Sequence, residues 1–283
     1  MSAQVINGKI IAENIKENLK ADIADFSRAP ELAIVMVGND YASDIYVRNK
    51  QKAAAKVGII SHYHHLDEDI SEDELLKIIE QLNEDQEVNG IIVQLPLPEH
   101  LNTNRIINAI SPLKDVDGFH PLNTGMLQNN EKPYFVAATP LGIMKLLETT
   151  NVNLSGKNVV IIGASLIVGR PLATLLLNQG CTISITHSKT ANIMEYTKKA
   201  DIIVAACGVA NLVKADWIKD NAVLIDVGIN RMENGKICGD IDFEDVLQKA
   251  GAITPVPGGV GPMTIAMLLY NTVEAYKLQT TAE

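Results

Sequence analysis

The chain of 283 residues lacks an apolar run of the ~18 residues that a membrane-spanning helix needs. Its N-terminal segment, 1–20, places charged residues among the apolar ones, so it also lacks the continuous apolar centre of a secretory signal. Basic residues do not outnumber acidic ones, since 24 Lys and Arg stand against 34 Asp and Glu and give a net charge of −10. We therefore expect a cytoplasmic protein that binds neither membranes nor nucleic acid.

Cysteine is also scarce, with three residues at Cys181, Cys207 and Cys238. No two of them have the spacing of a metal-binding or redox pair, which favours free thiols in a reducing compartment. The histidine-rich run 62–65 has no accompanying cysteine or spaced carboxylate to complete a metal shell, so we expect no metal site. Apolar residues make up 47% of the chain, enough to bury the cores of two domains.

Short apolar runs alternate with helix-like stretches along the chain, a pattern typical of α/β proteins with parallel sheets. The segment 111–140 is rich in Pro, Gly and Asn and is predicted to be a loop that crosses between domains. We predict an N-terminal α/β domain over 1–138, completed by a C-terminal helix in 263–283, and a Rossmann-like domain over 139–262. The expected strands include 32–37, 90–95, 158–162 and 223–227, and the expected helices include 41–57, 103–110, 190–199 and 243–250.

A glycine-flanked turn, Gly163–Gly169, follows the expected strand 158–162 and opens a helix. A dinucleotide site needs this context, because glycine permits a tight turn and the helix N-terminus presents free N–H groups to the pyrophosphate. Ser165 stands where the GxGxxG pattern has its second glycine. The turn therefore predicts a dinucleotide site, with a plain strand-to-helix connection as the alternative.

The next expected strand ends at Thr186 and is followed by His187, Ser188 and Lys189. Folds that bind NAD usually carry an acid here, which holds the ribose 2′-hydroxyl. A hydroxyl and a cation suit a 2′-phosphate instead, so this segment favours NADP over NAD. The alternative is a solvated loop with a chance lysine.

Four polar residues of the first half are candidates for chemistry. Tyr46 and Lys50 are four residues apart on an expected helix and share one face, although an exposed lysine beside a half-buried tyrosine has the same spacing. Gln94 ends an apolar strand, where open parallel sheets place ligands, but it could equally cap that strand. Asp117 precedes a glycine, so it either forms a turn or holds a ring with adjacent N–H donors.

The segment 254–264 (TPVPGGVGPMT) combines two prolines before its first glycine with three glycines. Proline fixes the backbone and glycine permits close approach, so the segment predicts a loop of defined shape that meets a ligand.

Six segments together resemble the bacterial methylenetetrahydrofolate dehydrogenase/cyclohydrolases: YVRNK, VQLPLP, KDVDGFHPLNTG, GASLIVGRP, DVGIN and TPVPGGVGPMT. They occur in that family's order, and the resemblance covers about residues 5–276. It implies a two-domain homodimer that oxidises 5,10-methylenetetrahydrofolate with NADP and hydrolyses the methenyl product to 10-formyltetrahydrofolate.

The resemblance also implies residue roles. Lys50 is the implied catalytic lysine, Gln94 assists it, Asp117 binds the pterin ring, and Tyr46 stacks beside the folate. Val93, Leu95, Pro257, Gly258, Gly259, Val260 and Gly261 are implied to line the folate side, and Gly163, Ala164, Ser165, His187, Ser188, Lys189 and Ile229 to contact the cofactor. Many relatives carry Arg at the position of Ala164, so we expect the NADP preference here to depend on Ser188 and Lys189.

Two other functions fit parts of the pattern. One is a different two-domain NADP-dependent dehydrogenase, acting on shikimate or an amino acid. The other is a catalytically silent dinucleotide sensor, although such a protein would not need a proton-transfer lysine. The short-chain dehydrogenases also use Tyr-x-x-x-Lys, but there the pair follows the dinucleotide unit, whereas here it precedes it.

Overall fold

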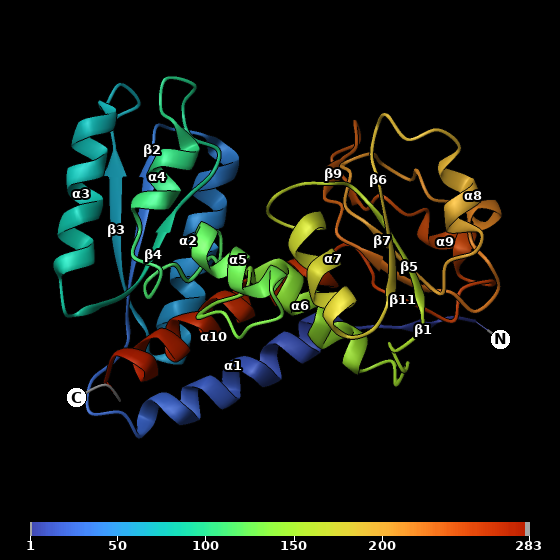
Figure 1. Ribbon diagram of the computed structural model, residues 1–283, viewed down its shortest axis with the longest axis horizontal. Helices are drawn as coiled ribbons and strands as arrows, with labels where there is room; N and C mark the ends of the chain where they lie inside the picture. The colour runs from blue at the N-terminus through green and yellow to red at the C-terminus, as the bar shows by residue number, and fades with distance from the viewer. Residues whose placement is uncertain (1, 281–283) are drawn as a thin grey trace. The chain divides into compact units, whose positions relative to one another are not determined.

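Apolar runs rich in Val and Ile form two separate parallel sheets, each inside its own unit of the chain (Figure 1). The structure is a computed structural model that describes residues 2–280. We call residues 13–138 and 265–280 the lysine unit, and residues 2–12 and 139–264 the glycine-turn unit. Within the described residues, no helix has both the length and the apolar character to cross a membrane.

The sheet of the lysine unit has the order β3-β2-β4, with β2 (Glu31–Val37), β3 (Ile60–Leu66) and β4 (Val88–Val93) all parallel. Alternate residues of β2, namely Ala33, Val35 and Val37, pack with α3 (Glu72–Glu84) and α4 (Thr103–Ala109) in one core. The neighbouring β2 residues are buried as well, so the strand reads as a continuous apolar run and not as an alternation. This unit also contains α2 (Tyr41–Val57) and α5 (Pro121–Gln128).

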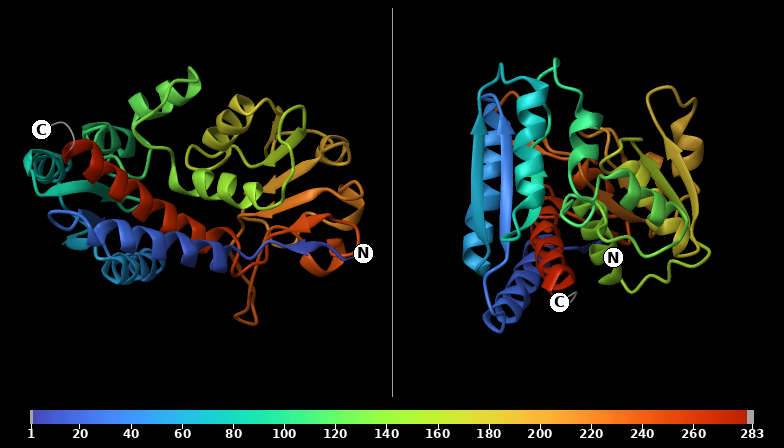
Figure 2. Two further views of the ribbon diagram at one scale, coloured as in Figure 1. Left: turned by 90° about the horizontal axis from the view of Figure 1, so that it is seen from below. Right: turned by 60° about the vertical axis from the view of Figure 1, so that its left-hand side comes forward.

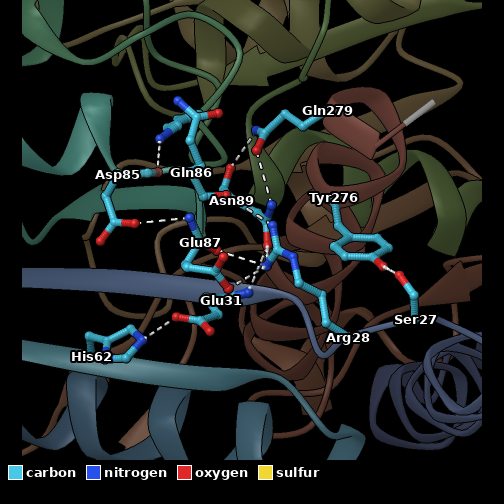
Figure 3. A network of polar contacts seen from close by, with 11 residues as sticks. Ser27, Arg28, Glu31, His62, Asp85, Gln86, Glu87, Asn89, Tyr276 and Gln279 are labelled. Carbon is cyan, nitrogen blue, oxygen red and sulfur yellow. Dashed lines mark hydrogen bonds and ion pairs between the residues drawn. The ribbon is translucent and has the colours of Figure 1, made fainter. Parts of the chain in front are cut away.

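The last helix, α10 (Val260–Thr280), lies beside α1 (Gly8–Ala24), and the larger part of each helix belongs to the lysine unit (Figures 1 and 2). A polar network joins its C-terminal end to the loops of this unit (Figure 3). Arg28 donates to the carbonyl oxygens of Gln86 and Glu87, at 2.9 and 3.0 Å, and lies 5.3 Å from the ring centroid of Tyr276. Gln279 Nε2 donates to Asn89 O at 2.9 Å. The C-terminal helix thus completes the lysine unit.

The glycine-turn unit has a parallel sheet of order β1-β11-β8-β7-β5-β6. Its strands are β1 (Gln4–Val5), β5 (Asn158–Ile162), β6 (Thr182–Thr186), β7 (Ile202–Ala205), β8 (Val223–Asp226) and β11 (Ala252–Ile253), and a separate hairpin pairs β9 (Asn230–Arg231) with β10 (Ile237–Cys238). Its helices are α6 (Ala138–Glu148), α7 (Gly169–Asn178), α8 (Ile193–Thr197) and α9 (Phe243–Val246), with a 3-10 turn at Ala215–Trp217. Helix α7 packs against β5 and β6.

The predicted α/β class is confirmed, but several local expectations were wrong. Residues 111–140 are not one loop, because α5 forms within them. Its start is stabilised by Pro121 in the first turn and by His120, whose Nδ1 accepts from Leu122 N at 3.1 Å. The helices expected over 190–199 and 243–250 are shorter, at Ile193–Thr197 and Phe243–Val246.

The division into units differs from the predicted domains in the first twelve residues. These were assigned to the N-terminal domain, yet β1 pairs with β11, and Gln4 N donates to Gly251 O at 2.9 Å. A strand of two residues has no periodicity to detect, and its partner lies at the other end of the sequence. The other chain crossings fall at 138/139 and 264/265.

Candidate functional site

Lys50 lies on the buried side of α2 and is only 8% exposed. Asp40 is the N-cap of this helix, and its carboxylate accepts from Ser43 N at 2.7 Å and so fixes the first turn. Lys50 Nζ donates to Gln94 Oε1 at 3.0 Å. A lysine amine held this way has a defined direction, which a solvent-facing lysine lacks.

Gln94 follows the last residue of β4, and hydrogen bonds hold both its backbone and its side chain. Its backbone N donates to Val35 O at 2.8 Å, which extends the pairing of β4 with β2 by one residue. Its Nε2 donates to Leu95 O at 2.7 Å, so its Oε1 faces Lys50. The side chain therefore belongs to the lysine site, at the strand end where the sequence placed it.

Asp117 is brought close to the same lysine. Burial raises the pKa of its carboxyl, and the positive charge of Lys50 acts in the opposite direction. Tyr46 is 40% exposed and lies one helical turn before Lys50 on α2, and burial raises the pKa of its phenol. The structure thus gathers Lys50, Gln94 and Asp117 and places Tyr46 beside them; their roles in chemistry stay predictions.

Two residues beside Asp117 were missed by the sequence reasoning. Lys114 Nζ donates to the carbonyl oxygens of Leu82, Asn83 and Asp85 at 3.0, 2.8 and 2.6 Å, at the C-terminal end of α3. Asp115 is 1% exposed and accepts from Phe119 N, His120 N and Asn123 Nδ2 at 3.1, 2.8 and 2.9 Å. Burial raises its pKa to about 6.

Together these two residues fix the loop that carries Asp117 from both sides. The sequence does carry one signal for them, since these two charged residues directly precede the apolar Val116. A buried stretch admits charged side chains only where each has a hydrogen-bonding partner, so the pair indicates such partners.

In the glycine-turn unit, the turn after β5 depends on its two flanking glycines. Gly163 has φ +122°, and a Cβ there would overlap the carbonyl oxygen of Ala206. A Cβ on Gly169 would overlap the carbonyl oxygen of Gly163. Both glycines are therefore required by close backbone approach, not by flexibility alone.

Ser165, which replaces the second glycine of the pattern, has a structural task. Its Oγ accepts from Val168 N and Gly169 N at 3.1 and 3.4 Å and so holds the turn against the first residue of α7. Within residues 2–280, no acceptor takes the backbone N–H groups of 164–167. Four free N–H groups in the turn directly before α7 suit an anionic pyrophosphate, so the residues present fit a dinucleotide.

The segment after β6 is stabilised locally and exposes the predicted phosphate-binding residues. His187 N donates to Thr190 Oγ1 at 3.0 Å, and Lys189 N donates to His187 Nδ1 at 3.2 Å. The side chains of Ser188 and Lys189 are exposed, next to the turn of the neighbouring strand β5. Ile229, 54% exposed, lies on the loop between β8 and β9.

The segment 257–261, predicted to be a loop that lines the folate, lies in the glycine-turn unit, and its last two residues already belong to α10. Its shape depends on the N-terminal segment: Lys9 N donates to Gly258 O at 2.9 Å, and a Cβ on Gly8 would overlap the carbonyl oxygen of Gly259. The predicted folate contact of this segment stays a prediction.

Sequence comparison matches two family models to the chain. The model described as tetrahydrofolate dehydrogenase/cyclohydrolase, catalytic domain, matches residues 6–117, and the corresponding NAD(P)-binding domain matches residues 137–280. A bifunctional protein FolD of Aquifex aeolicus is 51% identical over 279 residues, which cover 97% of this chain and 96% of that protein. The FolD of Bacillus subtilis is also 51% identical, over 98% of this chain and 99% of the relative.

Solved structures agree. The bifunctional FolD of Campylobacter jejuni superposes with a TM-score of 0.96 at 49% identity, covering 98% of this chain and 99% of the other. The Trypanosoma brucei enzyme, solved with NADP and an inhibitor, has a TM-score of 0.94 at 36% identity and 99% coverage of both chains. A shikimate dehydrogenase of Aquifex aeolicus reaches a TM-score of 0.51 at 16% identity over 90% of this chain and 94% of that one, a likeness of fold alone.

Proposed function

This chain belongs to the tetrahydrofolate dehydrogenase/cyclohydrolase family, and from that premise we propose that it oxidises 5,10-methylenetetrahydrofolate with NADP and then hydrolyses the methenyl product to 10-formyltetrahydrofolate. The observation that carries the proposal is the buried Lys50 amine, which Gln94 orients next to the Asp117 carboxyl. An acid–base group and a carboxyl that can bind a ring with adjacent N–H donors lie in one place.

In the first reaction, a hydride leaves the methylene carbon and the folate becomes the methenyl cation. NADP supplies the hydride acceptor when it is bound. The chain's own contribution is to hold both molecules: the free N–H groups of 164–167 and the exposed Ser188 and Lys189 suit the phosphates, and Asp117 suits the pterin. Such alignment contributes up to about 7–11 kcal/mol to lowering the barrier.

In the second reaction, water adds to the methenyl carbon. Lys50 in its neutral form accepts one water proton as the C–O bond forms. The carbon–N5 bond then breaks, the remaining hydroxyl becomes the formyl carbonyl, and its proton passes to N5. The proton on Lys50 is released to solvent, which balances the reaction. Gln94 keeps the amine aimed at the water without adding a charge of its own.

The alternatives from the sequence receive no such support. A shikimate or amino-acid dehydrogenase would share the fold, but the matched family is the folate one. A silent dinucleotide sensor gives no reason for a buried lysine held by Gln94. We also propose, from the family resemblance, that the protein works in the cytoplasm as a homodimer, for which light scattering would give twice the mass of the chain.

The testing experiment gives the purified protein methylenetetrahydrofolate with NADP or NAD in parallel. NADPH and the methenyl absorbance should appear together with NADP, and added methenyltetrahydrofolate should be consumed without any cofactor. NADP bound without turnover of either substrate would refute the proposal and favour the sensor.

A further inference from the structure

Asp226, the first residue of the DVGIN segment, is the last residue of β8, and the proposed reaction does not use its carboxylate. Asp226 is 3% exposed, and a second aspartate, Asp240, is completely buried beside it. Removing a carboxylate from water is unfavourable unless hydrogen bonds stabilise its charge. The donors to this pair therefore show which parts of the chain the two carboxylates hold together.

Asp240 joins two loops. Its Oδ2 accepts from the backbone N of Cys207 and of Gly208, at 2.7 and 2.9 Å, and so fixes the turn after β7. Its Oδ1 accepts from Asn230 Nδ2 at 2.8 Å, which fixes the residue directly after Ile229. One side chain thus determines the relative placement of two loops that both follow parallel strands.

Asp226 in turn holds Asp240. Its Oδ1 accepts from Asp240 N at 2.9 Å, and its Oδ2 accepts from Ile241 N at 2.8 Å. Two glycines make room for the pair, because a Cβ on Gly239 would overlap the carboxylate of Asp226 and a Cβ on Gly228 would overlap that of Asp240. This close packing fixes the position of the Asp240 carboxylate.

The turn that Asp240 holds adjoins the dinucleotide turn. Ala206 N donates to Ile162 O at 2.8 Å, and the carbonyl of Ala206 occupies the space that a side chain on Gly163 would need. Strands β6 and β7 lie on opposite sides of β5, so the strand order reverses here, where open parallel sheets bind their ligands. The β6 side carries Ser188 and Lys189 for the adenosine phosphate, which leaves the β7 and β8 side for the nicotinamide half.

We propose that Asp240, held in place by Asp226, is a positioning residue that shapes the nicotinamide half of the NADP site. It acts through the Cys207–Gly208 turn and through Asn230, without contact to the cofactor. The proposal rests on the proposed function, because it takes NADP to be the ligand.

The test measures binding by titration calorimetry, with NADP and with adenosine 2′,5′-bisphosphate, which contains only the adenosine half. Asp240→Asn replaces one of two accepting oxygens by an NH2 group, which must face a donor either at the Cys207–Gly208 turn or at Asn230, and it should raise the Kd of NADP about 10- to 100-fold. The Kd of the bisphosphate should stay within about twofold. Hydrolysis of methenyltetrahydrofolate, which needs no cofactor, should continue in the same variant.

Asp201→Asn is the matched control. Asp201 directly precedes β7, at the opposite end from the Cys207–Gly208 turn, and its carboxylate also accepts a backbone N–H, from Asn158 at 2.8 Å. Both ligands should bind this variant like the parent. Should Asp240→Asn fail to fold, Asn230→Ala should show the same selective loss of NADP affinity, about two- to tenfold.

Three results would overturn the proposal: unchanged NADP affinity in the folded variant, a parallel loss of both ligands, or an equal NADP loss in Asp201→Asn. Failure of the proposed function is separate, since the unsubstituted protein would then turn over no methylenetetrahydrofolate whatever the variants bind.

Discussion

The lysine unit presents side chains to its predicted substrate, whereas the glycine-turn unit presents mainly backbone N–H groups to its predicted cofactor. In the first, Lys50 and Gln94 are aimed by helix α2 and by the end of β4. In the second, the turn 163–169 acts through its shape, which Gly163 and Gly169 make possible. In the lysine unit, a single side-chain change should therefore remove one chemical step. In the glycine-turn unit, cofactor binding should change only when the shape of the turn changes.

Both units nevertheless stabilise their loops by the same means. Asp115 forms an isolated bridge with Ile91 of β4, and Asp226 is the last residue of β8. Each buried carboxyl accepts three hydrogen bonds from the chain, and burial raises the pKa of each to about 6. In the lysine unit the carboxylate holds the loop of a predicted ligand side chain. In the glycine-turn unit, Asp226 holds Asp240, whose carboxylate in turn holds the backbone of the Cys207–Gly208 turn.

The largest effect should come from Lys50→Gln. The variant loses the proton acceptor, so cyclohydrolase activity should fall about 10²- to 10⁴-fold, while the dehydrogenase keeps part of its rate because hydride transfer needs no proton acceptor. Separate assays with methenyltetrahydrofolate and with methylenetetrahydrofolate plus NADP measure the two. Lys52→Gln, on the exposed side of the same helix, is the control. Full hydrolysis by Lys50→Gln would refute the role of this lysine.

A second prediction concerns pH and tests whether burial of a carboxylate is costly in the lysine unit. The folded pKa of Asp115, about 6, lies above its usual 3.8, so the folded chain binds a proton that the unfolded chain releases between these values. This contribution favours folding at the acid end of that window and is lost as pH rises through about 6. The loss amounts to about 3 kcal/mol, so Asp115→Asn should flatten the fall of stability between about pH 4.5 and 7.

Urea unfolding at several pH values measures that slope. Asp201→Asn is the matched control, because the hydrogen bond from Lys219 lowers the pKa of Asp201, and its contribution is therefore lost only as pH falls below the usual 3.8. Its slope above pH 4.5 should match the parent's. A parent-like slope in Asp115→Asn as well would mean that Asp115 is not protonated in this window.

Asp117→Asn should have a smaller and more selective effect. The amide keeps the size of the side chain but loses the charge and one acceptor, so folate affinity should fall about tenfold. NADP affinity should not change, since its predicted contacts lie in the glycine-turn unit. Equilibrium binding of tetrahydrofolate and of NADP distinguishes the two. Unchanged folate affinity would contradict the pterin contact.

Much of this arrangement could be predicted because its signals are local. The strand β2 is an unbroken apolar run, α3 begins with the capping box of Ser71 and Glu74, and Tyr46 and Lys50 share a helix face by spacing alone. The position of Gln94 follows from the rule that ligands meet the ends of parallel strands.

The missed features depend on contacts between distant residues. Asp240 and Cys207 are 33 residues apart, and nothing near either one indicates that a carboxylate will accept its N–H. Lys114 reaches the end of α3, 29 to 32 residues earlier in the chain. The strand β1 exists only because β11 is there to pair with it. Such partners are fixed by the assembled sheet, which sequence periodicity does not describe.

The smallest effect should come from Lys189→Ala, which tests whether the glycine-turn unit uses any side chain for affinity. Lys189 is exposed, so solvent and salt screen its attraction for a 2′-phosphate, and NADP affinity should fall only about three- to tenfold. NAD has no 2′-phosphate, so its affinity should stay the same. Added salt should weaken NADP binding less in the variant than in the parent. Equal losses for NADP and NAD would show that Lys189 stabilises the turn 187–190 instead, and the contrast between the two units would then hold without exception.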